Sequence, residues 1–100
     1  MTVKTDMISE FVRAANRVET LAPADRCLLL EKGVSASGAL RGLLVKTGKV
    51  APVDDAAERV IQYIASNIEQ MSDETVSKAM LALAAQIRTM RILNREPTPA

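Results

Sequence analysis

The stretch AERVIQYIASNIEQMSDETVSKAMLALAAQIRTM, residues 57–90, decides the fold. Its apolar residues recur at alternating intervals of three and four residues on both sides of the polar segment MSDET. This spacing places them along one face of a helix, with the period of a coiled coil. The stretch therefore predicts two helices with apolar seams, formed by Ile61, Ile64, Ile68 and Met71 in the first helix and by Val76, Met80, Leu83, Ile87 and Met90 in the second.

The connection between these helices predicts how they lie. Ser72 is placed to cap the second helix, and Asp73 and Glu74 follow at its positive N-terminal end. Two helices joined by so short a segment fold back on each other. We therefore expect an antiparallel helical hairpin from about Asp54 to Leu93.

The second helix of the hairpin is apolar well beyond its seam, through Leu81, Ala82, Ala84, Ala85, Ile92 and Leu93. A helix that is apolar around much of its circumference is normally buried on more than one side. A chain of 100 residues has little other structure to cover it. We therefore expect a homodimer in which the hairpins of two chains form a four-helix core.

The N-terminal half predicts further helices. Apolar spacing indicates a helix over residues 6–20, and the segment LAPAD ends it. Helices over residues 24–32 and 36–47 are expected next, with Gly33 stopping the first and Gly48 closing the second. A single bent helix over residues 24–47 is the alternative.

The stretch between those helices, GVSASGALRG, holds three of the chain's four glycines. No strand pattern precedes it in the sequence, and its glycine spacing is not that of a phosphate-binding loop. Gly38 and Gly42 are four residues apart and so share one helix face, where they would let another helix approach closely. We expect close helix contact there, within the chain or with a partner.

Length and composition indicate one all-α domain. Phe11 and Tyr63 are the only aromatic residues, so the core must be aliphatic. We expect the domain to comprise residues 1–94, followed by a disordered polar tail over residues 95–100. A single cysteine and the absence of a signal-like or membrane-spanning apolar run indicate a soluble cytoplasmic protein.

The residue types do not favour catalysis. The chain has no histidine, the commonest acid-base group and a frequent zinc ligand. Cys27 has no visible catalytic base and is expected to be a small buried residue. The acids Asp54, Asp55 and Glu58 are explained by helix capping rather than by a cation. We therefore expect no catalytic, metal-binding or cofactor-binding residues, and a protein that is not an enzyme.

Charge is unevenly distributed although the formal net charge is only +1. An acidic face is expected at Asp54, Asp55, Glu58 and Glu69, and a basic face at Arg88, Arg91 and Arg95. Either face could meet a complementary patch on a protein partner. We therefore expect protein–protein interaction, with transcription regulation as the leading interpretation, and a structural subunit of a larger assembly remains open.

Residues 24–49 allow a competing interpretation. They read as helix, glycine turn and helix, with Arg41 and Lys46 available for phosphate contacts. A small helix-turn-helix DNA-binding regulator is therefore the alternative, although the near-neutral composition makes nucleic acid the less favoured partner.

Several short segments resemble the TraM quorum-sensing antiactivators of rhizobia and agrobacteria. They are Leu21-Ala22-Pro23-Ala24-Asp25, Tyr63-Ile64 with Ile68-Glu69 and Met71, and Ile92-Leu93 with Pro97. The glycine-rich helix, the long final helix and the polar tail depart from that family's pattern. The resemblance implies a dimeric helical protein that binds a LuxR-type transcription factor and blocks its binding to DNA.

Overall fold

The computed structural model describes residues 6–49 and 56–95. Within them the chain is all-helical, which confirms the expected fold class. The elements are α1 (Met7–Asn16), the short 3₁₀ helix η1 (Val18–Thr20), α2 (Pro23–Lys46), α3 (Ala56–Ser66), the 3₁₀ helix η2 (Ile68–Gln70) and α4 (Asp73–Arg95). Arg95, expected to begin a disordered tail, is instead the last residue of α4. Asp54, Asp55 and residues 96–100 lie outside the described residues.

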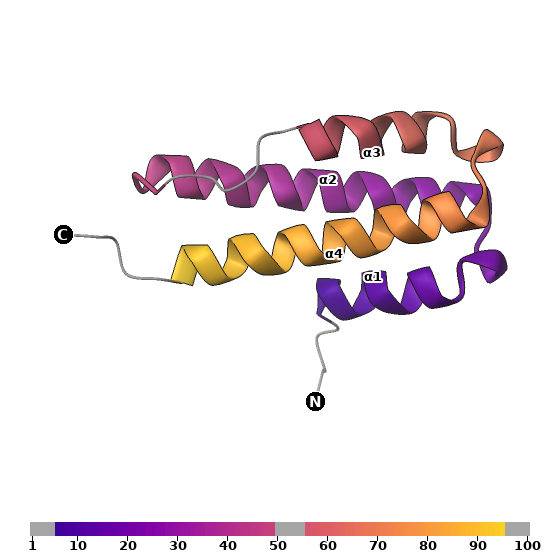
Figure 1. The fold of residues 1–100 in the computed structure, drawn as a ribbon, viewed down its shortest axis with the longest axis horizontal. Coiled ribbons are helices and arrows are strands. Elements are labelled where there is room, and N and C mark those ends of the chain that lie inside the picture. Colours follow the sequence, from indigo (N-terminus) through magenta and orange to yellow (C-terminus); the bar gives the residue numbers. More distant parts are fainter. Residues whose placement is uncertain (1–5, 50–55, 96–100) are drawn as a thin grey trace.

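The two long helices form the centre of the molecule (Figure 1). α2 and α4 lie side by side and run in the same direction, with α3 along the outer side of α2 and α1 along the outer side of α4. The molecule is thin, with extents of 48 × 38 × 16 Å, so both long helices keep an outward face. No helix within residues 6–49 and 56–95 is long and apolar enough to cross a membrane.

The second half of the chain repeats the first at an offset of 50 residues. The short helices end at Asn16 and Ser66, the 3₁₀ helices occupy 18–20 and 68–70, and the long helices begin at Pro23 and Asp73. The backbone angles agree as well: φ and ψ are −93° and 135° at Leu21 and −91° and 139° at Met71. The fold is therefore built from two copies of one helix–3₁₀–helix unit.

The two units exchange their short helices. The most extensive packing is between α2 and α4, followed by α1 on α4 and α3 on α2. Each short helix thus lies against the long helix of the other unit. α3 and α4 do run in opposite directions, as expected of a hairpin (Figure 1), but α3 packs mainly on α2 rather than along α4.

The apolar seam of α4 is buried inside the chain. Its residues are fully or almost fully covered, by α1 on one side and α2 on the other: Val76, Met80, Leu83, Ile87 and Met90. On α3 and η2 the seam is less uniform, because Ile61 is buried whereas Ile64, Ile68 and Met71 are partly buried against the same core. The four helices of one chain cover this seam, so a second chain is not required to do so.

α2 is one continuous helix, which corrects the expected break at Gly33 and agrees with the alternative of a single helix over this stretch. Gly33 lies in the middle of α2 because the core leaves no room for a side chain. A Cβ there would lie 2.6 Å from Leu83 Cδ1 and 2.9 Å from Phe11 Cζ. The helix ends instead at Gly48, whose φ of +78° is the left-handed conformation typical of a helix stop, as expected.

Gly38 and Gly42 make no close helix contact within the chain. A Cβ at either position would have nothing within 4 Å. Both lie on the outward face of α2, whereas Gly33 lies on its inward face. The glycine that allows close approach of two helices is therefore Gly33.

Substituting Gly33 by Ala should lower the free energy of unfolding. Crowding a packed core costs about 1–3 kcal/mol, which exceeds the gain of roughly 1 kcal/mol in helix propensity. Gly38→Ala and Gly42→Ala are matched controls and should each raise stability by about 0.5–1 kcal/mol, because they change only propensity. Urea unfolding followed by circular dichroism measures all three. Equal stabilisation by the three substitutions would contradict the close contact at Gly33.

Candidate functional site: an apolar groove between α3 and α4

A groove of about 390 Å³ separates α3 from α4. Since α3 lies on α2, the two helices do not close on each other beyond η2. The groove is lined from α3 by Ala57, Val60, Ile61 and Ile64, and from α4 by Thr75, Lys78, Ala79 and Ala82. Six of these eight side chains are purely aliphatic, so the groove suits apolar groups.

Exposed apolar side chains extend the groove outward. Val60 is 60% exposed and Tyr63 is 64% exposed, and both also line a second hollow along α3. On α4, Leu81 and Ile92 are 42% and 48% exposed on the outward face. An apolar groove with exposed apolar side chains in its lining and beside it, such as Val60 and Tyr63, is typical of an interaction site.

The first unit has larger or charged side chains at the positions equivalent to the groove. Met7 and Leu29 correspond to Ala57 and Ala79, and both pack against the core. At the rim, Glu10 and Lys32 take the places of Val60 and Ala82, and their side chains form an ion pair of 3.0 Å. The second unit carries small or apolar residues at all four places.

A buried polar cluster holds α3 against the two long helices. Glu58 Oε1 accepts hydrogen bonds from Ser37 Oγ at 2.5 Å and from Gln86 Nε2 at 2.9 Å. Arg41 donates to both carboxylate oxygens of Glu58, each at 2.5 Å. Within the described residues no buried side-chain nitrogen or oxygen lacks a hydrogen-bond partner. The cluster joins α2, α3 and α4 and so fixes one wall of the groove.

Glu58 is therefore a structural residue, which corrects its expected place on an acidic partner-facing surface. Burial alone would raise the pKa of its carboxyl group, but the hydrogen bonds from Arg41 and Ser37 and the charge of Arg41 hold that pKa below its ordinary value. The ionised form is thus favoured in the folded protein. Its capping role would involve Asp55, which lies outside the described residues.

Arg91 has the same task in the other half of the molecule. It corresponds to Arg41 in the repeat, and it donates to Asp6 Oδ1 at 2.6 Å, directly before α1. This bond lowers the pKa of Asp6. Arg91 is therefore engaged within the chain, whereas Arg88 and Arg95 are exposed on α4 as the expected basic face requires.

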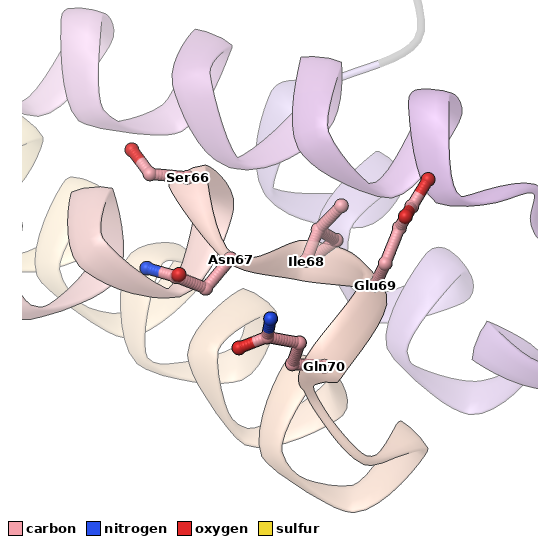
Figure 2. A pocket seen from close by; sticks show the side chains of 5 residues that line it. All are labelled: Ser66, Asn67, Ile68, Glu69 and Gln70. Carbon is pink, nitrogen blue, oxygen red and sulfur yellow. The ribbon is translucent and has the colours of Figure 1, made fainter.

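Glu69, the remaining acid of the expected acidic face, is exposed in η2 (Figure 2). A shallow hollow there is lined by Ser66, Asn67, Ile68, Glu69 and Gln70. In Figure 2 the side chains of Asn67 and Gln70 point away from those of Ile68 and Glu69, so the polar groups do not converge on one point. Asn67 already donates to the carbonyl of Tyr63. The hollow therefore lacks the converging donors of a polar ligand site.

Cys27 is partly buried, close to its expected role. Its thiol donates to Glu31 Oε1 at 3.1 Å, and this bond, with burial, raises the pKa of the thiol. A raised pKa keeps the sulfur protonated and therefore poorly nucleophilic. Among the described residues no group of three or more His, Cys, Asp or Glu is arranged to hold a metal ion.

No known protein family, curated protein or solved structure matches the chain.

The polar cluster gives the protein an acid-sensitive contact. Because the pKa of Glu58 is lower in the folded protein than its ordinary value of 4.5, its stabilising contribution is present above that pH and is lost as the pH falls through the folded-state pKa. Glu58→Gln should lower the free energy of unfolding at pH 7 by about 1–3 kcal/mol, and this difference should shrink in acid. Urea unfolding across the pH range measures it.

Glu69→Gln is the matched control, because it makes the same chemical change at an exposed residue. It should leave the free energy of unfolding within about 0.5 kcal/mol of the wild type. A Glu58→Gln effect that is no larger than this, or that does not vary with pH, would show that the cluster contributes little.

Proposed function

We propose that this chain is a regulatory protein that acts by binding another protein. The observation that carries the proposal is the open apolar groove between α3 and α4, with the exposed Val60 in its lining and the exposed Tyr63 next to Val60 in a second hollow along α3. An exposed surface of this kind costs solubility and is typically kept where a partner covers it. The buried polar groups, in contrast, are occupied in holding the helices together.

The partner is proposed to be a transcription factor, which the chain would inhibit as an antiactivator does. The support is the resemblance to the TraM-type family, which implies a LuxR-type transcription factor as target. Occlusion is the proposed mechanism: a helix or surface that the transcription factor needs for DNA binding is held against the groove. The basic residues Arg88 and Arg95 would favour encounter with an acidic surface.

The helix-turn-helix alternative loses its main support. Its turn was expected within GVSASGALRG, and those ten residues all lie inside α2. A recognition helix that leaves a turn and enters the major groove therefore has no counterpart in residues 24–46. Binding to nucleic acid is therefore an outcome that the capture experiment tests, not a second proposal.

The tagged protein should capture a protein from a lysate of its source organism even after nuclease treatment. The captured protein, once purified, should bind its DNA in a gel-shift assay and lose that binding when the chain is added. Val60→Glu should weaken capture, because it places a charge among the aliphatic side chains that line the groove.

Leu28→Glu is the matched control, since Leu28 is also exposed but lies on the outward face of α2. It should leave capture unchanged. Companions that are lost on nuclease digestion would mean that the chain binds nucleic acid and would contradict the proposal.

A further inference from the structure

We propose that the groove between α3 and α4 binds an acidic amphipathic helix of another protein, whose aliphatic side chains fill the space above Ala57 and Ala79. The inference rests on the proposed function and identifies the chemistry of the partner. It names the element that would be bound, the side chains that would enter and the charge that would surround them.

The repeat indicates which groups the groove lacks. At the equivalent place in the first unit, the chain supplies Met7 and Leu29 from its own helices, and both pack against the core. The second unit has alanine at both positions, and a groove of about 390 Å³ results. Side chains of the size and chemistry of Leu or Met are therefore what the missing volume would take.

The dimensions of the groove suit a helix. Its lining residues span Ala57 to Ile64 on α3 and Thr75 to Ala82 on α4. Each span is seven residues of rise, or about 10 Å, which is roughly two helical turns. Two aliphatic side chains one turn apart on a bound helix would fit this length, in the manner of a helix lying in an apolar groove.

The charges of α4 indicate which apolar helices the groove would bind best. From Lys78 to its end, α4 carries Lys78, Arg88, Arg91 and Arg95 and no acidic residue. Lys78 lines the groove and pairs with Glu74 Oε1 at 3.0 Å, and Arg91 pairs with Asp6, so the basic surface of α4 is formed by the exposed Arg88 and Arg95. A bound helix with acidic residues flanking its apolar stripe would be complementary to these charges.

A second copy of this chain is the competing occupant. Light scattering in the test below separates it from a different protein.

The probe for the test is a fluorescein-labelled peptide of four Leu-Glu-Glu-Leu repeats, with four Leu-Lys-Lys-Leu repeats as the charge control. Fluorescence anisotropy should show saturable binding of the Leu-Glu peptide to the wild type and at least about tenfold weaker binding of the Leu-Lys peptide. Binding of the Leu-Glu peptide should weaken as salt is added.

Two variants assign the binding to the groove. Val60→Glu should lower affinity at least about tenfold, because it places a charge in the apolar site. Val45→Glu, at a similarly exposed valine on α2, is its matched control and should change affinity by less than about twofold. Ala57→Met with Ala79→Leu copies the first unit, fills the groove without changing charge and should abolish binding, with folding checked by urea unfolding.

The proposal is overturned if both groove variants bind the peptide as the wild type does, or if the Leu-Lys peptide binds equally well. It is also overturned if light scattering shows a wild-type dimer that Val60→Glu dissociates, since the occupant would then be a second copy. These outcomes differ from failure of the proposed function, in which no protein is captured from lysate whatever the state of the groove.

Discussion

The fold depends on the contact of Leu83 with the bare backbone at Gly33, beside Phe11. Positions 33 and 83 are equivalent in the repeat and face each other across the packed pair α2 and α4. Two leucines would overfill that place and two glycines would leave a void, and both errors destabilise a core. One large and one absent side chain solve the problem. Close packing of α2 on α4 in turn sets where α1 and α3 can lie, because each short helix packs on the long helix of the other unit.

The two similar units also differ in their side chains away from the Gly33–Leu83 contact. This difference leaves the second unit with an open surface. Arg41 and Arg91 are equivalent, and each anchors the start of a short helix through an acid, Glu58 or Asp6. The first unit has larger side chains and an ion pair between Glu10 and Lys32 at the positions equivalent to the groove. The second unit instead buries its acid in a four-residue polar cluster and leaves the equivalent groove open. Its wall is held in place by hydrogen bonds that do not depend on filling the groove.

Local patterns in the sequence predicted the helices better than their packing. The seam of α4, the Ser72 cap and the stop at Gly48 were identified correctly, because each depends on spacing or on one residue's backbone preference. Gly33 was misread as a helix stop because glycine is commonly found where helices end. The reason for a glycine inside α2 is a side chain distant in the sequence, Leu83. Glu58 was wrongly placed on a partner-facing surface, because the partners that bury it, Ser37 and Arg41, come from elsewhere in the chain. The repeat conserves the type of residue more than its identity, so comparison of the halves at an offset of 50 was the signal that could have revealed it.

The alanines that open the groove lower the stability of the isolated chain, and a bound partner could restore what they lose. This possibility distinguishes the groove from a packing defect. Alanine at positions 57 and 79 forgoes the burial that Met7 and Leu29 contribute in the first unit, and each buried aliphatic side chain of that size is worth about 1.5–3 kcal/mol. A chain this short has little stability to spare. The exposed Val60 and Tyr63 beside the groove add apolar surface where the first unit has Glu10 and Arg13. A partner that supplies the missing aliphatic groups would recover burial that the isolated chain lacks, so binding and stability would be coupled through the same few side chains.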